Sequence, residues 1–171
     1  MDARLDRIKA AFDALDTNSN GYLEADDFEM LAYRIIRSLN VPDDSPKAGE
    51  LRASCRGYWQ GLVGVLDRNG DGRLSHQEYA RFHEPDAYED GVRPYADALT
   101  AICDRDDDGF VQHDDFVRGM RAVGFPVDNI EALFQAFDPH GTGQVSTTEW
   151  RTAIEEYFLA DGNHAVGDTL V

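Results

Sequence analysis

The sequence predicts an all-α protein built from four helix–loop–helix units. The first observation is a twelve-residue segment that occurs four times: an aspartate, a glycine five residues later, an aliphatic residue two positions further on, and a carboxylate at the end. The second is that apolar residues recur every three to four positions before and after these segments, which is the spacing of amphipathic helices. The segments are Asp16–Asp27, Asp67–Glu78, Asp104–Asp115 and Asp138–Glu149, numbered loops 1 to 4 here.

Apolar stripes define the helices that we expect on either side of the loops. The stripes that enter the loops are Ile8, Phe12 and Leu15, then Trp59, Val63 and Leu66, then Ile130, Phe134 and Phe137. The stripes that leave them are Phe28, Leu31, Ile35 and Leu39, then Phe116 and Met120, then Trp150, Ile154 and Tyr157. Before loop 3, Cys103 occupies the place of these apolar residues, so we expect it to be a buried, reduced thiol.

The spacing within each loop suits a hard divalent cation. Such an ion takes six to eight oxygen ligands, which a looped backbone supplies from positions 1, 3, 5, 7, 9 and 12. Glycine at position 6 allows the sharp turn, because it adopts a positive φ without steric cost. The aliphatic residue at position 8 predicts a short β-bridge between neighbouring loops. Position 8 is Leu23, Leu74, Val111 and Val145.

The order of the units predicts two paired lobes, packed face to face as one compact body. Pro85, Gly91 and Pro94 should prevent a single helix from joining the two pairs. Between loops 1 and 2, Ser45 and Pro46 predict the start of a long helix. The tail is expected either to be disordered or to dock on the core. The expected parts are an N-terminal pair at 1–83, a linker at 84–93, a C-terminal pair at 94–160 and the tail at 161–171.

With these loops and flanks, nearly all of the chain resembles the EF-hand superfamily. The long interval between loops 1 and 2, the interrupted middle and the ending ADGNHAVGDTLV are similar to the sarcoplasmic calcium-binding proteins and the calerythrin-like bacterial proteins. The resemblance implies a calcium-binding protein. The sequence shows neither a nucleophile motif nor a phosphate-binding glycine loop, so we expect no enzymatic activity.

The first three loops have enough oxygen donors to hold an ion. Asp27 and Asp115 close loops 1 and 3 and are one methylene shorter than glutamate, which favours the smaller Mg²⁺ beside Ca²⁺ in those two loops. The predicted ligands are Asp16, Asn18, Asn20, the Tyr22 carbonyl, Glu24 and Asp27 in loop 1, Asp67, Asn69, Asp71, the Arg73 carbonyl and Glu78 in loop 2, and Asp104, Asp106, Asp108, the Phe110 carbonyl and Asp115 in loop 3.

Loop 4 departs furthest from the pattern. His140 replaces the oxygen donor at position 3, and Thr142 offers only a neutral hydroxyl at position 5. Asp138 and Glu149 remain as its side-chain carboxylates. We therefore expect loop 4 to be weak or empty, to complete the pair with loop 3, and to leave about three bound ions in all.

The composition limits the partners. The 33 acidic and 16 basic residues give a formal charge of −17, which argues against nucleic acid and anionic membranes as partners. A signal-peptide core and a long apolar run are both absent from the sequence, so we expect a cytoplasmic protein. We also expect it to be a monomer. Cys55 has no second cysteine nearby and is expected to be structural, and His76 and His113 are expected on the surface.

Two functions remain open at this stage. The first is a buffer for Ca²⁺, or for Ca²⁺ and Mg²⁺, that exposes little apolar surface. The second is a sensor that opens an apolar groove for a target protein, whose identity the sequence does not give. Adaptable sensor grooves are rich in methionine, whereas only Met30 and Met120 follow the initiator here, which favours the buffer.

Overall fold

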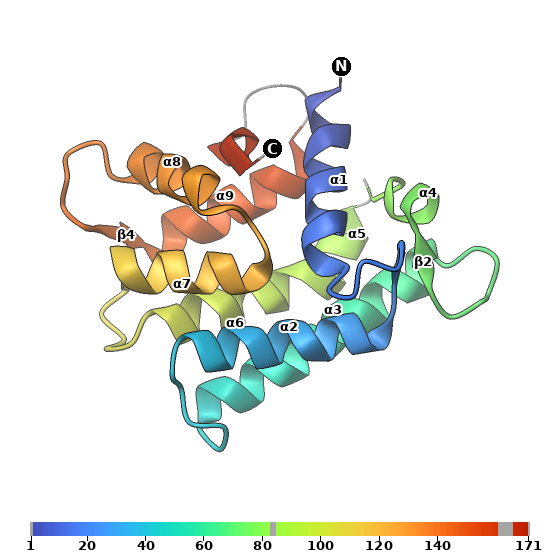
Figure 1. Ribbon diagram of the computed structural model, residues 1–171, viewed down its shortest axis with the longest axis horizontal. Helices are drawn as coiled ribbons and strands as arrows, with labels where there is room; N and C mark the ends of the chain where they lie inside the picture. Colours follow the sequence, from blue (N-terminus) through green and yellow to red (C-terminus); the bar gives the residue numbers. More distant parts are fainter. Residues whose placement is uncertain (1, 83–84, 161–165, 171) are drawn as a thin grey trace.

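The computed structural model describes residues 2–82, 85–160 and 166–170. It is mainly helical, as predicted, with short strands inside the loops (Figure 1). The N-terminal elements are α1 (Ala3–Leu15), β1 (Tyr22–Leu23), α2 (Ala25–Ser38), α3 (Pro46–Leu66), β2 (Leu74–Ser75) and α4 (His76–Tyr79). The C-terminal elements are α5 (Pro85–Ala87), the π-helix η1 (Tyr88–Val92), α6 (Arg93–Cys103), β3 (Phe110–Gln112), α7 (His113–Val123), α8 (Val127–Phe137), β4 (Gln144–Ser146), α9 (Thr147–Leu159) and the 3₁₀ helix η2 (Val166–Leu170).

Two small antiparallel sheets pair the loops as predicted. Strands β1 and β2 join loop 1 to loop 2, with Leu23 opposite Leu74. Strands β3 and β4 join loop 3 to loop 4, with Val111 opposite Val145. These position-8 side chains are all buried, so each strand pair anchors its two loops to the core.

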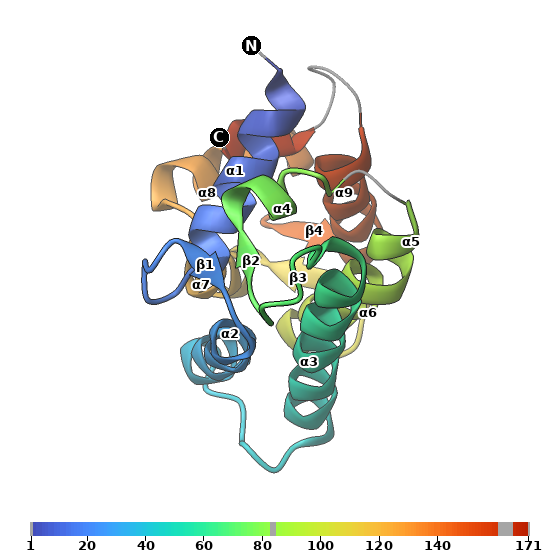
Figure 2. The same cartoon turned by 90° about the vertical axis from the view of Figure 1, so that its right-hand side faces the viewer.

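The two halves share one apolar core. Helix α3 packs along α6, and α2 packs along α7, so the N-terminal and C-terminal pairs meet over long helix faces (Figures 1 and 2). Buried residues from α1 through η2 belong to the same cluster. The expectation of one compact body is confirmed, and the ion loops lie at its periphery.

The buried face of α3 differs from the predicted stripe by about one residue. Trp59 is only partly buried, whereas the neighbouring Tyr58 is fully buried, and both rings contact Phe28, at centroid distances of 5.4 and 5.0 Å. The helix packs against both α2 and α6, and this broad contact selects a different face from the one that the aromatic spacing suggests. The buried residues are Ala48, Leu51, Cys55, Tyr58, Leu62 and Leu66.

Most of the expected linker at 84–93 is helical in the structure. Helix α4 ends at Tyr79, so no single helix joins loops 2 and 3, but the chain is helical again from Pro85 to Cys103. Pro85 is the first residue of α5, where its missing N–H has no helical partner to lose, whereas Pro94 directly follows the π-helical turn η1. The prediction that no single helix joins loops 2 and 3 is confirmed for the described residues.

The described part of the tail docks on the core. Leu170 is buried, and Asp168 pairs with Arg7 of α1 at 2.5 Å. Arg7 is fully buried and also donates through Nε to the Tyr157 carbonyl at 2.8 Å, while the Tyr157 hydroxyl donates to the Arg7 carbonyl at 2.6 Å. These bonds connect the first long helix, α1, to the last one, α9, and to the tail. Of the two predicted alternatives, disordered or docked on the core, residues 166–170 are docked.

Candidate metal centres

The four loops have the same backbone fold around the first aspartate. In each loop, the N–H of the position-6 glycine donates to this carboxylate, at 2.7 to 3.0 Å. The same glycines have positive φ, between 77° and 86°, which glycine tolerates without strain. The glycines are Gly21, Gly72, Gly109 and Gly143, and their partners are Asp16, Asp67, Asp104 and Asp138.

Loop 2 brings three predicted ligands together. One carboxylate oxygen from each of Asp67, Asp71 and Glu78 lies within 4.8 Å of the other two. The Glu78 side chain is buried and accepts hydrogen bonds from the Ser75 N–H at 2.9 Å and the Arg68 N–H at 3.3 Å. The Ser75 N–H bond is the main cause that lowers the pKa of Glu78, so this carboxylate is kept charged and turned into the loop.

Loop 3 forms the second carboxylate group among the described residues. Oxygens of Asp104, Asp106 and Asp108 also lie within 4.8 Å of one another. Desolvation, together with the neighbouring Asp108 carboxylate, raises the pKa of Asp106. Negative charge is thus crowded in this loop, and a bound divalent cation would relieve it.

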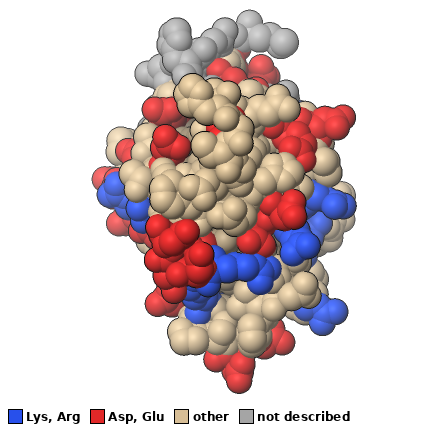
Figure 3. Space-filling model, turned by 90° about the vertical axis from the view of Figure 1, so that its left-hand side faces the viewer, with Lys and Arg blue, Asp and Glu red and all other residues tan. Residues whose placement is uncertain are grey.

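Basic side chains partly neutralise loop 3 from outside. Arg105 Nε donates to the closing Asp115 at 2.8 Å, and its guanidinium also donates to the Leu39 carbonyl. Lys47 Nζ donates to the Asp104 carbonyl at 2.6 Å and pairs with Asp107 at 2.7 Å. Figure 3 faces the end of the molecule that carries loops 3 and 4, and shows acidic and basic side chains side by side there. The segment between α2 and α3 therefore contacts an ion loop of the other half.

Loop 1 closes through a deeply buried aspartate. Asp27 is 1% exposed and accepts hydrogen bonds from the Thr17 N–H and hydroxyl, at 3.1 and 2.8 Å, and from the Glu24 N–H at 2.9 Å. The Asn20 amide nitrogen lies 3.1 Å from a Glu24 carboxylate oxygen. The structure thus brings Asn20 to the Glu24 side chain and Asp27 to the Glu24 backbone, and the loop 1 ligand set stays a prediction.

The comparisons with known proteins address the same segments. The family model for the EF hand matches residues 8–32 and 64–83, and the family model for the EF-hand domain pair matches residues 108–157. The solved structure of a Streptomyces coelicolor calcium-binding protein is 32% identical and has a TM-score of 0.78, over 91% of this chain and 97% of that one. The chain belongs to the EF-hand family.

Two further proteins are similar to this chain, one in sequence and one in fold. Calerythrin from Saccharopolyspora erythraea is 26% identical over 89% of this chain and 90% of its own length. A sarcoplasmic calcium-binding protein from amphioxus shares the fold with a TM-score of 0.69 at 20% identity, over 99% of this chain and 96% of that one. The resemblance to these proteins is confirmed, and this is a calcium-binding EF-hand protein of the calerythrin type.

Within this EF-hand protein, loop 4 differs from the others at its closing residue. Glu149 is exposed, although it stands at position 12 like Glu78. Asp138 accepts bonds of 2.7 Å from both the N–H and the hydroxyl of Thr142, and the hydroxyl bond is the main cause that lowers its pKa. The donor-poor loop thus satisfies its first carboxylate internally.

Sequence reasoning missed why Glu149 points outward. In loops 1 and 2, the backbone N–H of position 2 donates to the closing carboxylate, from Thr17 to Asp27 and from Arg68 to Glu78. Loop 4 has Pro139 at this position, and proline has no N–H to donate. The proline is visible in the sequence, but the hydrogen bond that it removes is not.

Two histidines and two cysteines remain among the residues that the sequence analysis singled out. His76 is exposed, as expected, and stacks on Phe12 with ring centroids 3.7 Å apart. His113 is half-buried rather than fully on the surface, and lies 2.7 Å from Glu131, whose hydrogen bond is the main cause that raises the pKa of His113. Cys55 and Cys103 are buried free thiols, and burial raises the pKa of both, to about 12 for Cys55.

Proposed function

We propose that this EF-hand protein is a cytoplasmic buffer that takes up about three divalent ions, at loops 1, 2 and 3. The observation that carries the proposal is the convergence of three carboxylates in loop 2 and three in loop 3, within 4.8 Å in each case. Such groups repel one another when they are empty, and oxygen ligands at this density suit Ca²⁺. Loops 1 and 3, which close on aspartate, would also take Mg²⁺.

The distribution of apolar side chains supports a buffer over a sensor. Met120 is buried in the core, and Met30 is 45% exposed on α2, so the two methionines do not form one surface. The exposed large apolar side chains come from several different elements, and a target groove needs them on one contiguous face. These residues are Leu5, Met30, Tyr33, Val65, Phe110 and Val127.

A sensor is the second candidate, and one comparison favours it. The Streptomyces coelicolor relative is described as acting in prokaryotic calcium-mediated regulation. A protein with that role must signal to a partner whether calcium is bound, and this requires a surface that changes when calcium binds. We propose a monomer without nucleic-acid or membrane partners in either case. Among the described residues, no helix is both long enough and apolar enough to cross a membrane.

Calcium titration in the presence of a hydrophobic-surface dye separates the two functions. The metal-free protein is titrated at millimolar Mg²⁺, and tryptophan fluorescence reports occupancy, because Trp59 contacts Phe28 directly after loop 1 and Trp150 contacts Phe116 directly after loop 3. A buffer fills without a rise in dye fluorescence. A rise that follows micromolar Ca²⁺ would favour the sensor, and a titration that saturates at two or four tight ions would contradict the proposed stoichiometry of three.

A further inference from the structure

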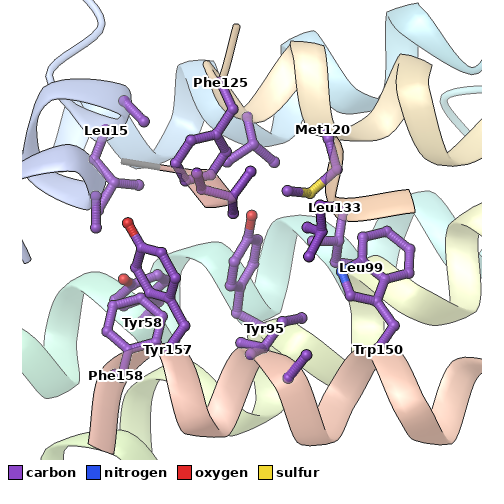
Figure 4. A pocket seen from close by; sticks show the side chains of 16 residues that line it. Leu15, Tyr58, Tyr95, Leu99, Met120, Phe125, Leu133, Trp150, Tyr157 and Phe158 are labelled. Atoms are coloured by element: carbon purple, nitrogen blue, oxygen red, sulfur yellow. The ribbon is translucent and has the colours of Figure 1, made fainter. Parts of the chain in front are cut away.

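An apolar cavity of about 70 Å³ lies in the shared core, away from the ion loops' carboxylates (Figure 4). Its walls come from both halves of the chain, and almost all of the lining surface is carbon. Leu15 of α1, Tyr95 and Leu99 of α6, Met120 of α7, Trp150 of α9 and Leu170 of η2 are among the residues that form it.

One polar atom in this cavity wall has no hydrogen-bond partner. Within the described part of the chain, the Tyr95 hydroxyl is the buried side-chain group left unsatisfied. The other two tyrosine hydroxyls of the wall are engaged: the Tyr58 hydroxyl lies 3.5 Å from that of Tyr79, and the Tyr157 hydroxyl donates to the Arg7 carbonyl. Figure 4 shows the Tyr95 oxygen directed into the space between the surrounding side chains.

An unpaired buried hydroxyl is costly, so its presence calls for a partner. Burial raises the pKa of Tyr95 well above its ordinary value, which keeps the group a neutral hydrogen-bond donor at every physiological pH. A water molecule is a poor partner, because buried water makes two to four hydrogen bonds and this cavity offers only one free polar group. A molecule that is apolar except for one hydrogen-bond acceptor matches both the apolar wall and its one unpaired hydroxyl.

We propose that the cavity binds a small, neutral, apolar molecule that carries one hydrogen-bond acceptor, and that the Tyr95 hydroxyl donates to this acceptor. Space for one water takes roughly 10–15 Å³, so about 70 Å³ accommodates several heavy atoms, on the order of one six-membered ring with a small substituent. Nothing in the proposal depends on the role of the ion loops as buffer or sensor.

A surface groove adjoins this cavity. The groove lies between α1, the turn at 124–126 and η2, and three of its residues, Ala14, Phe125 and Leu170, also belong to the cavity wall. The turn sits close to α1 at Gly124, where an added Cβ would lie 2.9 Å from the Ala14 carbonyl oxygen. A ligand would enter where the tail segment η2 meets this turn.

The test uses two probes of equal heavy-atom count on the full-length, calcium-loaded protein. Cyclohexanone carries one acceptor, and methylcyclohexane carries none. We expect calorimetry to give a Kd of about 0.1 to 1 mM for cyclohexanone. The variant Tyr95→Phe keeps the ring and should weaken cyclohexanone about tenfold, the value of one hydrogen bond, while leaving methylcyclohexane unchanged.

Two further readings keep the test decisive. Without ligand, Tyr95→Phe should raise the melting temperature by a few degrees, since it removes an unpaired buried hydroxyl. Ala153→Leu adds carbon atoms to the cavity wall and should abolish binding of both probes. Failure of cyclohexanone to bind the wild-type protein would overturn the proposal. Equal binding of cyclohexanone to the wild type and to Tyr95→Phe would remove Tyr95 from it, whatever happens to Ala153→Leu.

Discussion

Loops 2 and 4 end on the same residue type, yet they place it differently. Glu78 is 8% exposed and accepts two backbone hydrogen bonds from within its loop unit, whereas Glu149 is exposed to solvent. Both helices that follow begin with a serine N-cap, Ser75 or Ser146, whose side chain accepts from the closing glutamate's N–H. The helix starts are therefore alike, and the difference arises inside the loops.

The difference shows that a closing glutamate needs a donor to hold it. In loop 2 the N–H groups of Ser75 and Arg68 hold Glu78, whereas in loop 4 Pro139 has no N–H to match that of Arg68. Without an ion, such a hydrogen bond decides whether the carboxylate already faces the site or has to be brought in on binding. Loop 2 is thus organised for an ion in advance, and loop 4 would bear the cost of ordering its glutamate.

Removal of metal should have the largest effect, because it acts on loops 1, 2 and 3 together. Each site stabilises the fold by about 2.7 kcal/mol at a hundredfold excess of ion over Kd. Three sites would shift the melting temperature of a domain of this size by roughly 15 °C or more. Calorimetric melting in calcium and in EDTA measures the shift. Identical melting curves would mean that the organised loops do not bind ions.

Neutralising each closing glutamate in turn tests the comparison of loops 2 and 4 directly. Glu78→Gln should remove the loop 2 ion, since the amide loses one of the charged oxygens that face the site. The number of bound ions should fall by one, and calcium should then stabilise the variant by about 2.7 kcal/mol less than the wild type. Titration calorimetry gives the stoichiometry.

Glu149→Gln is the matched control at the same position of loop 4. It should leave both stoichiometry and calcium-dependent stability unchanged, because Glu149 is exposed and the proposed function leaves loop 4 empty. A loss of one ion in this variant, or no loss in Glu78→Gln, would show that the closing residue's orientation without metal does not predict occupancy.

Restoring the missing donors of loop 4 tests the comparison by creating a site instead of removing one. The triple variant Pro139→Ala, His140→Asp and Thr142→Asp restores the position-2 N–H and adds oxygen donors at positions 3 and 5. We expect a fourth calcium ion with micromolar affinity. Pro139→Ala alone is the control and should not create a site, because the donors at positions 3 and 5 are still missing. A fourth ion in the single variant would make the proline, rather than the donor set, the cause of the weak site.

The sequence predicted the fold well, because its strongest signals are local. Helix stripes, glycine at position 6 and the aliphatic position 8 each act within a few residues, and the structure confirms the helices, the turns and both strand pairs. The buried face of α3 was misjudged because packing against two partners, α2 and α6, selected Tyr58 over Trp59. The break between loops 2 and 3 was predicted from Pro85, Gly91 and Pro94, but the return to helix at Pro85 was not.

The same distinction between local and long-range contacts applies to the candidate sites. The positions of the carboxylates follow from the loop register, so loops 2 and 3 could be predicted as groups. The contacts of Arg105 with Leu39 and of Lys47 with Asp104 could not, because they join segments far apart in the chain. The Tyr95 cavity was equally hidden, since it depends on how several helices meet rather than on any one stripe.

The smallest effect is expected from the second position of loop 3, where a side chain takes the role that a backbone N–H has in loop 2. Arg105 Nε binds Asp115 at 2.8 Å and competes with an ion for the closing carboxylate. Arg105→Ala should increase the calcium affinity of loop 3 by roughly two- to fivefold, the range of a partly exposed ion pair.

Arg68→Ala, at the same position of loop 2, is the control: it keeps the N–H that holds Glu78 and should leave site affinities unchanged. Calcium titrations at low salt measure both. Equal tightening in the two variants would point to general removal of positive charge near an acidic protein, and weaker binding in Arg105→Ala would mean that the arginine positions Asp115 for the ion rather than competing with it.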